Sequence, residues 1–507
     1  MYNKKSKKII KFSNAKAFFK KIKKTRKIIH CHGVFDLVHP GHLRHFDFCK
    51  SKADILVVSL TADKFIKKGL YRPLVPEQLR AKNLAALEIV DYVIIDKNKY
   101  PYEAMNNIRP NFFAKGLEYS KSKNPLTQEE IKVAKKIGCK MIFSPGDIIF
   151  SSTKLIEDLK PKISYDKLKL YLDHEKKKLP DFIKLLNSMK KIKVHIIGDL
   201  IIDTSSECKL IGGLHKTPTI SVSIMNSKDY IGGAGAVAKH FKSFLNNVTL
   251  TTVVSNDVLG KRAIRELKKN KIKLNSIHEK ERPTTNKNSF WVDGYKLLKV
   301  DKVSNENIQI STIEKIKKIL KNDKSDIVVF SDYRHGIFNQ NTISIFSKSL
   351  RKNKFIVADS QVASRWGNIT DFKKFDLITP TEKEARLSLL EQDLPIRTLT
   401  DLLLKKTNAK NAILKLGDKG LISLDKQRKD YISLDPFVDE VLDANGAGDA
   451  LLAYSSATLY FTKSLILSSI MGCLAASCKC EMVGNVPVTL QQIKRKIDKI
   501  LKDNLYK

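Results

Sequence analysis

Short apolar runs recur along the chain and alternate with longer stretches of helical periodicity. Residues 28–31 and 55–59 are apolar and short enough to be buried strands, whereas residues 77–88 have apolar positions at helical spacing. Strands that alternate with amphipathic helices in this way are typical of a parallel sheet covered by helices, so the pattern predicts an α/β fold. Further strands are predicted at 92–95, 112–114, 141–143, 250–254, 327–331, 355–358, 377–379 and 412–416.

The α/β pattern is interrupted once, over residues 161–190, which are charged, helical in pattern and poor in glycine. We interpret this segment as a helical linker between two units, residues 27–160 and residues 191–507. Residues 1–26 form a lysine-rich extension. A chain of 507 residues is long enough for both units to bury a core. Residues 211–222 and 284–300 are β-like with little helical pattern, which predicts a small lid sheet in the second unit.

Composition narrows the class of protein. The chain is 42% hydrophobic, but no apolar run reaches the roughly 18 residues of a membrane span, and the N-terminus lacks the apolar core of a secretory signal. Residues 464–477 are the most apolar segment and fit a buried helix. The seven cysteines show no paired ligand spacing, so we expect buried structural thiols. We therefore expect a cytoplasmic protein with no membrane contact.

The formal charge of +40 raises the possibility of nucleic-acid binding. However, the lysines are spread along the whole chain, and no arginine-rich stripe with interleaved aromatic residues is present. We expect most of the charge to be solvated surface that helps to attract anionic nucleotides, and we do not expect a nucleic-acid partner.

The first motif that carries chemistry is Gly33-Val-Phe-Asp-Leu-Val-His39-Pro-Gly-His42, between a predicted strand and a predicted helix. A glycine at such a turn lets the backbone approach a phosphate, and a helix N-terminus supplies free N–H groups. His39 and His42 lie on one helical face, where both can hydrogen-bond to a triphosphate and stabilise charge at its α-phosphorus. A lone His-x-x-His would also fit a metal pair or surface histidines. The surrounding motif favours cleavage of a nucleoside triphosphate between its α- and β-phosphates.

With this motif, residues 27–160 resemble the cytidylyltransferase-like nucleotidyltransferases, which have a Rossmann-like fold. Residues 77–80 lie where that family places basic contacts to phosphate, residues 115–119 resemble its segment near the nucleotide, and residues 150–153 resemble its Ser/Thr phosphate cradle. The arginine that often closes the cradle is Ile156 here. The resemblance implies that His39 and His42 are catalytic. The residues that it implies to bind nucleotide or phosphate are Gly33, Phe35, Arg80, Lys115, Ser151, Ser152 and Thr153.

The second motif is Asp443-Ala-Asn-Gly446-Ala-Gly-Asp449, which precedes an Ala- and Leu-rich helix. The turn Gly446-Ala447-Gly448 can direct backbone N–H groups at a transferring phosphoryl group. Asp449 is placed to accept the proton of an attacking hydroxyl. Alone, the motif could be a helix-capping turn. Asp203, just after a predicted strand, and the glycine run at Gly232-Gly233 supply a carboxylate and close backbone suited to a sugar.

These features make residues 192–500 resemble the ribokinase-like (PfkB) sugar kinases. The resemblance implies that Asp449 is the catalytic base and that Glu384 supports Mg²⁺ through water. It implies that Lys415 and Gly417 belong to the nucleotide-binding turn, and that Asn485 lies in a late loop near adenine. Three departures concern the sugar and metal contacts. Ala236 and Thr381 replace asparagines that are common in the family, and a lysine often found after the position of Asp359 is absent.

Together the two units resemble bifunctional heptose 7-phosphate kinase/heptose 1-phosphate adenylyltransferases, with the order of the units reversed. The resemblance implies ATP-dependent phosphorylation of a sugar phosphate at its anomeric hydroxyl. It also implies nucleotidyl transfer from ATP, or CTP, to a sugar 1-phosphate for a surface polysaccharide. Mg²⁺ is the implied metal, and a homodimer is possible. One alternative is a kinase/cytidylyltransferase for another sugar or polyol phosphate. Another is a nucleotide-sensing or nucleic-acid-binding protein with a decayed site.

Overall fold

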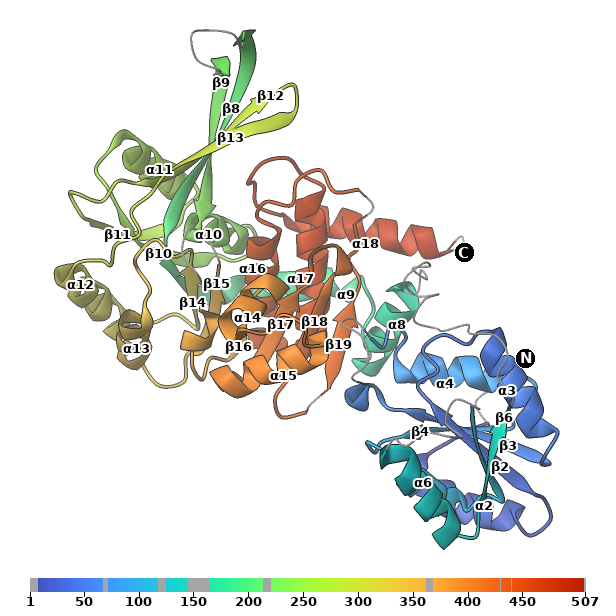
Figure 1. The fold of residues 1–507 in the computed structure, drawn as a ribbon. Coiled ribbons are helices and arrows are strands. Elements are labelled where there is room, and N and C mark those ends of the chain that lie inside the picture. Colours follow the sequence, from blue (N-terminus) through green and yellow to red (C-terminus); the bar gives the residue numbers. More distant parts are fainter. Residues whose placement is uncertain are drawn as a thin grey trace. The chain divides into compact units, whose positions relative to one another are not determined.

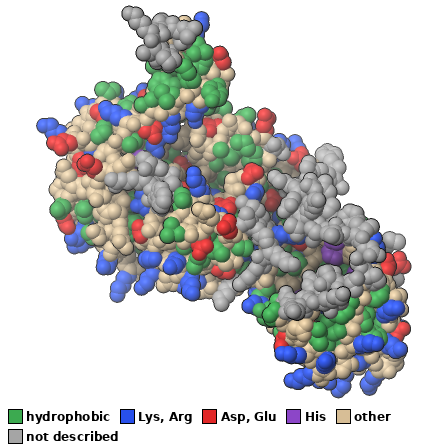
Figure 2. All heavy atoms as spheres, viewed as in Figure 1, with side chains coloured by type: hydrophobic (Ala, Val, Ile, Leu, Met, Phe, Trp, Pro, Cys, Tyr) green, Lys and Arg blue, Asp and Glu red, His purple; other side chains and the backbone are tan. Residues whose placement is uncertain are grey.

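The computed structural model of the chain divides into two units, residues 1–163 and residues 164–507 (Figure 1). It describes residues 8–66, 72–116, 125–144, 164–212, 220–361, 368–428, 430–438 and 440–505. No helix among these residues is both long enough and apolar enough to span a bilayer. Lys and Arg side chains are spread over the visible face of the protein (Figure 2).

The N-terminal unit is built on a six-stranded sheet with the order β1-β4-β3-β2-β5-β6 and with every neighbouring pair parallel. The strand order reverses between β2 and β5, and the carboxyl ends of the strands at such a switch point are the usual ligand site in parallel sheets. The first motif follows β2 directly. The strands are β1 (Ile9–Ile10), β2 (Ile28–Gly33), β3 (Ile55–Thr61), β4 (Tyr92–Asp96), β5 (Phe112–Gly116) and β6 (Lys140–Ser144).

Helices cover both faces of this sheet because its strands are apolar on both sides. Phe46 of α3 and Leu84 of α4 pack on one face, whereas Phe19 of α2 and Ile108 of α5 pack on the other. Residues 8–26 of the expected extension take part in this fold, since β1 extends the sheet at β4 and α2 contributes to the core. The helices are α2 (Ala15–Ile22), α3 (Pro40–Lys50), α4 (Glu77–Ala86), α5 (Tyr102–Ile108) and α6 (Pro125–Lys136).

The C-terminal unit is built on a nine-stranded sheet with the order β11-β10-β7-β14-β15-β16-β17-β18-β19. Neighbouring strands are parallel from β11 to β17, and the last two pairs are antiparallel. The strands are β7 (Lys193–Gly198), β10 (Asn247–Val254), β11 (Lys273–His278), β14 (Ile327–Asp332), β15 (Phe355–Ser360), β16 (Leu377–Ile378), β17 (Asn411–Lys415), β18 (Leu421–Asp425) and β19 (Tyr431–Leu434).

A second, four-stranded sheet projects from this body as the predicted lid (Figure 1). Its order is β13-β12-β8-β9. The chain passes straight from β7 into the lid, because β7 ends at Gly198 and β8 begins at Leu200. The lid strands are β8 (Leu200–Gly212), β9 (Ser221–Gly233), β12 (Thr285–Val292) and β13 (Tyr295–Lys302).

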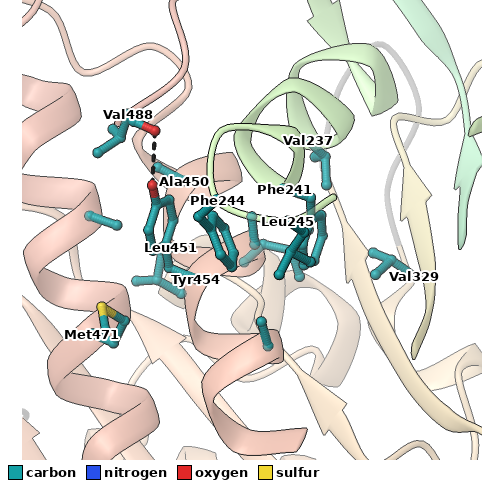
Figure 3. Close-up of a cluster of buried hydrophobic side chains, with 14 of the residues drawn as sticks. Val237, Phe241, Phe244, Leu245, Val329, Ala450, Leu451, Tyr454, Met471 and Val488 are labelled. Carbon is teal, nitrogen blue, oxygen red and sulfur yellow. Dashed lines mark hydrogen bonds between the residues drawn. The ribbon is translucent and has the colours of Figure 1, made fainter. Parts of the chain in front are cut away.

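The core of the C-terminal unit lies between α10, α16 and α17 and the adjoining face of the main sheet (Figure 3). Phe241 of α10 and Phe244, just beyond the end of that helix, pack with Tyr454 of α16, whose hydroxyl donates to the Val488 carbonyl at 2.8 Å. This packing fixes the start of α16, where the second motif lies. The helices are α10 (Ala234–Lys242), α11 (Val258–Lys269), α12 (Ile310–Lys321), α13 (Gln340–Ser349), α14 (Glu382–Leu389), α15 (Ile396–Thr407), α16 (Ala447–Thr462), α17 (Leu465–Cys480) and α18 (Leu490–Leu505).

The expected linker is helical, but it is part of the C-terminal unit. Helices α8 (Ser164–His174) and α9 (Asp181–Ser188) place Leu168, Phe182 and Leu186 in the core of that unit. Lys167, with 2% of its side chain exposed, pairs with Asp435 at 3.1 Å. The charge of this segment led us to expect a helical linker, but its apolar side chains are buried in the core of the C-terminal unit.

Candidate active sites

In the N-terminal unit, the loop after β2 is organised by a buried carboxylate. Asp36 accepts hydrogen bonds from the backbone N–H groups of Leu74 and Val75 at 3.0 and 2.8 Å, and from Arg72 Nε at 3.0 Å. Phe35 has a left-handed backbone (φ 49°), and its ring lies over Gly33, where an added Cβ would come within 3.0 Å. The motif loop is therefore held against the segment that precedes α4.

The two motif histidines cap α3. His39 Nδ1 accepts from the backbone N–H of Gly41 at 3.1 Å, and His42 Nδ1 accepts from the backbone N–H of His39 at 3.4 Å. Their rings stack with centroids 3.9 Å apart. Because each Nδ1 is an acceptor, each neutral ring carries its proton on Nε2. His39 therefore presents an N–H donor for a phosphate, whereas the ring of His42 also makes a hydrogen bond with the backbone of Leu37, which a phosphate would have to replace.

Both imidazoles are kept neutral. Burial, followed by repulsion from His39 and His45, lowers the pKa of His42 to about 3, and burial also lowers the pKa of His39. The histidines can thus stabilise a phosphate by donating hydrogen bonds near neutral pH before any protonation occurs. A bound polyanion would favour their protonated forms.

Arg80 differs from its expected role as a phosphate contact. Its side chain is fully buried, and the guanidinium donates to the carbonyls of Val34, Val75 and Thr61 and to Asp63. Its donors are engaged within the protein, so Arg80 fixes the motif loop instead of touching a ligand.

Lys115 is the last residue but one of β5, next to β2 at the switch point, and its ammonium pairs with Glu130 of α6. This position is close to the switch point, but the ion pair already balances its charge. The expected cradle residues Ser151, Ser152 and Thr153 lie outside the described residues.

In the C-terminal unit, the second motif forms the start of α16. Gly446 is the N-cap in a left-handed conformation (φ 80°), and an added Cβ would lie 2.7 Å from Asn485 Oδ1. A side chain at this position would strain the backbone and collide with the asparagine. Ala447 and Gly448 follow as the first helical residues, so their free N–H groups and the helix dipole favour an anion there.

Asp449 lies in the first turn of α16 and is 5% exposed. The Tyr333 hydroxyl donates to its Oδ1 at 2.6 Å. Burial raises the pKa of Asp449 to about 7, opposed by the Tyr333 hydrogen bond and reinforced by the nearby Asp359. A carboxylate with this pKa is well matched to accept a proton from a hydroxyl near neutral pH.

A buried lysine connects the acidic residues around the anion hole. Lys415, at the end of β17, places Nζ 2.9 and 3.2 Å from the two oxygens of Asp359. A Cβ added at Gly448 would come within 3.3 Å of the same nitrogen. Burial would lower the pKa of Lys415, but Asp359 and Glu384 outweigh it and the pKa is raised. The cation therefore stays charged beside the anion hole. The expected turn residue Gly417 follows it in an exposed left-handed turn (φ 62°).

Glu384 caps its own helix and faces the same cluster. Its Oε2 accepts from the backbone N–H of Thr381 at 2.7 Å, while Thr381 Oγ1 accepts from the backbone N–H of Glu384 at 3.2 Å. Burial raises the pKa of Glu384, with Lys415 opposing and Asp359 adding to the rise. Thr381, a departure from the family pattern, thus serves as the helix cap. The carboxylates of Glu384 and Asp359 offer the hard oxygen donors that Mg²⁺ prefers.

The expected sugar contacts meet where the lid joins the body. Asp203 on β8 lies against Gly232 on β9, where an added Cβ would come within 2.2 Å of its carboxylate, and Gly233 follows at the end of the strand. Burial raises the pKa of Asp203, whereas Lys287 and a hydrogen bond with Asn485 lower it. Asn485 thus lies close to both Asp203 and the Gly446 turn. Its place near adenine stays a prediction.

The structure also assigns contacts that the motifs did not. Tyr333 donates to Asp449, and Asp199 holds the Tyr333 loop by accepting from the backbone N–H groups of Tyr333 and His335 at 3.0 and 3.2 Å. A sequence motif does not reveal such contacts, because it does not show which residues meet. Asp36 was visible within the first motif without an assigned role.

The two sites define a protein with one nucleotidyltransferase-like unit and one sugar-kinase unit. Residues 191–489 match the family model of pfkB family carbohydrate kinases, and the chain belongs to this family. Residues 30–162 match the cytidylyltransferase-like model.

Among curated proteins, the chain is similar to two proteins that are both named bifunctional protein HldE. The one from Sulfurimonas denitrificans is 27% identical over 323 residues, which cover 62% of this chain and 65% of that protein. The one from Campylobacter fetus is 28% identical over 315 residues, covering 60% and 66%. The chain thus spans slightly less than two thirds of either relative.

Among solved structures, the C-terminal unit is similar in fold to phosphofructokinase-2 from Escherichia coli in complex with fructose-6-phosphate. The match has a TM-score of 0.51 at 14% identity, and it covers 61% of this chain and 99% of that one. At this identity the likeness concerns the fold alone.

Proposed function

We propose that the chain is a bifunctional sugar-activating enzyme of the cytoplasm. One unit would phosphorylate a sugar phosphate at its anomeric hydroxyl, and the other would transfer a nucleotidyl group to a sugar 1-phosphate. The observation that carries the proposal is the buried pair of Tyr333 and Asp449 at the N-terminus of α16. It combines a base of suitable pKa with an anion-binding helix terminus, the two parts that phosphoryl transfer needs.

In the kinase reaction, Asp203 and Asn485 hold the sugar while its hydroxyl points at Asp449. The carboxylate accepts the hydroxyl proton as the oxygen attacks the γ-phosphorus of ATP. Backbone N–H groups of the Gly446–Gly448 turn and the Lys415 ammonium stabilise the charge on the transferring group. Mg²⁺, held by Glu384 and Asp359 through water, would neutralise further phosphate charge.

In the transferase reaction, an oxygen of the sugar 1-phosphate attacks the α-phosphorus, and pyrophosphate leaves. The Nε2–H groups of His39 and His42 donate to the phosphate oxygens on which charge develops. Neither histidine is a covalent nucleophile, so positioning and hydrogen bonding supply the rate enhancement.

The relatives named HldE and the reading of both motifs make a heptose phosphate the first substrate to test. Purified full-length protein would be given heptose 1-phosphate with ATP and with CTP in parallel, and pyrophosphate release would be measured. Release with ATP supports the adenylyltransferase. Release with CTP alone assigns a cytidylyltransferase, the second candidate. No release with either nucleotide, from protein that still binds nucleotide, contradicts heptose as the sugar.

The lid supports a homodimer. Of the 17 exposed large hydrophobic side chains in the described residues, eight lie on the lid sheet or directly beside it, and Figure 2 shows hydrophobic side chains gathered there. A second copy offers the same apolar surface in a two-fold contact. Sedimentation velocity would give a dimer for the native chain and a monomer for Ile224→Lys/Leu298→Lys. A native monomer at micromolar concentration would contradict the dimer. The eight residues are Leu210, Ile211, Ile220, Ile224, Met225, Tyr295, Leu298 and Val300.

A further inference from the structure

A second cluster of reactive side chains lies beneath the catalytic helix of the N-terminal unit. Cys31 of β2 and His45 and Cys49 of α3 place one ligand atom each within 4.8 Å of one another. The two sulfur atoms are 3.3 Å apart, and Cys49 Sγ is 3.8 Å from His45 Nε2. The sequence does not reveal this group, because Cys31 and Cys49 are 18 residues apart and only the fold brings them together.

Both thiols are cut off from water. Cys31 is 1% exposed, Cys49 is fully buried, and both belong to the apolar core between the sheet and its helices. The hydrogen bond with Cys31, aided by His45, lowers the pKa of Cys49 to about 6, whereas burial raises the pKa of Cys31.

The imidazole of His45 is oriented toward the sulfurs. Its Nδ1 lies 2.6 Å from Ser144 Oγ, which in turn can donate to the Lys115 carbonyl at 3.4 Å. When the serine donates to that carbonyl, its oxygen accepts the proton of Nδ1. The lone pair of His45 then resides on Nε2, on the side of Cys49. An outer hydrogen bond that fixes the tautomer in this way is a regular feature of histidine metal ligands.

We propose that Cys31, His45 and Cys49 form a metal site whose natural ion is Zn²⁺. Two thiolates and one imidazole are the soft and borderline donors that Zn²⁺ selects. Tetrahedral Zn²⁺, with bonds of about 2.3 Å to sulfur and about 2.0 Å to nitrogen, spaces two sulfurs about 3.8 Å apart and sulfur and nitrogen about 3.5 Å apart. The observed distances are 3.3 Å between the sulfurs and 3.8 Å between Cys49 Sγ and His45 Nε2, so the sulfurs would have to separate by about 0.5 Å when the ion binds.

Binding as two thiolates releases the protons of both thiols to solvent and changes no oxidation state. Within the described residues the group has three members. The ion would tie α3 to β2 one turn from His42, because His42 and His45 lie on the same helix. It is therefore a positioning element for the transferase motif, and it takes no part in the kinase unit.

Cobalt substitution tests the site in untagged, full-length protein that has been stripped with a chelator and kept reduced. We expect one equivalent of Co²⁺ to produce thiolate-to-cobalt charge-transfer absorption and the visible bands of a tetrahedral ion, and Zn²⁺ to abolish both. Binding without these bands, or no binding, would overturn the proposal. The proposal would also be overturned if Cys31 and Cys49 were found joined by a disulfide in protein purified under reducing conditions.

Variants identify the ligands. Cys49→Ser and His45→Gln should each weaken Co²⁺ binding by about tenfold or more and change the absorption bands. Cys139→Ser removes another buried free thiol of the same unit and should leave the spectrum unchanged. Since His45 is only partly buried, its variant stays informative even where a cysteine variant fails to fold. Unchanged bands and affinity in folded His45→Gln protein would contradict the assignment.

Discussion

At the scale of single residues, Asp449 must be buried enough to act as a base near neutral pH and still be able to lose its proton. Its pKa of about 7 meets both needs. Because the ionised carboxylate is the active form, we expect kcat/KM of the kinase to fall as the pH drops below 7. The loss approaches about tenfold for each further pH unit. The measurement is a pH profile of sugar phosphorylation by the full-length protein.

The hydrogen bond from Tyr333 sets the pH at which the kinase activity falls on the acidic side of that profile. The Tyr333→Phe variant loses the hydrogen bond that lowers the pKa of Asp449, so the acidic limb should move to higher pH. A tyrosine with a purely structural role would reduce the rate without moving the limb. An unshifted limb would therefore show that the hydrogen bond does not tune the base.

Lys415 is expected to matter for both catalysis and stability. The Lys415→Met variant leaves the buried Asp359 without its partner, and we expect a loss of about 3–5 kcal/mol in unfolding free energy. It also removes a donor beside the anion hole, which should lower kcat of the kinase by about 10²-fold or more. Thermal unfolding and kinase assays on the same preparation test both effects. Lys415→Arg keeps the charge and should recover part of the stability.

The sequence identified the residues of each motif but not the contacts between motifs. Asp449 and the Gly446–Gly448 turn are found where a helix N-terminus was predicted, because caps and turns are local. The partner of Asp449 is 116 residues away, and so pattern alone could not pair it with Tyr333. Arg80 was expected to contact phosphate. In the structure it instead donates hydrogen bonds to backbone carbonyls that only the fold brings near it.

At the scale of elements, the catalytic start of α16 depends on how its middle is packed. Phe241→Ala empties a fully buried position in the core between α10 and α16, which should cost about 3–5 kcal/mol. Both tryptophans, Trp291 and Trp366, lie in the C-terminal half of the sequence, so urea unfolding followed by their fluorescence reports on this unit. Phe461→Ala, on the exposed end of α16, is the control and should stay within about 0.5 kcal/mol. Equal losses would contradict the assigned core.

Most central strands were predictable, because parallel strands buried on both faces form continuous apolar runs. Several of the described strands at or near the sheet edges were not. β18 and β19 are antiparallel additions with weak patterns, and β1 is two residues long. The lid was predicted as a β region, but not that β8 would begin immediately after β7. This direct passage is what carries Asp203 from the sheet onto the lid.

At the scale of the whole molecule, the residues that we propose for the two reactions lie in separate units of one chain. Asp449→Asn should abolish the kinase and spare the transferase, whereas His42→Ala should abolish the transferase and spare the kinase. Separate assays of phosphorylation and of pyrophosphate release on each folded variant measure this. Loss of both activities in either variant would contradict two independent sites.

The boundary between the units has a practical consequence for anyone who divides the chain. A fragment that starts at residue 191 lacks α8 and α9 and exposes the surface that Leu168, Phe182 and Leu186 cover. Each such side chain accounts for about 1.5–3 kcal/mol of burial. The fragment should therefore accumulate in inclusion bodies. A fragment that starts at residue 164 keeps α8 and α9 and should be recovered in solution.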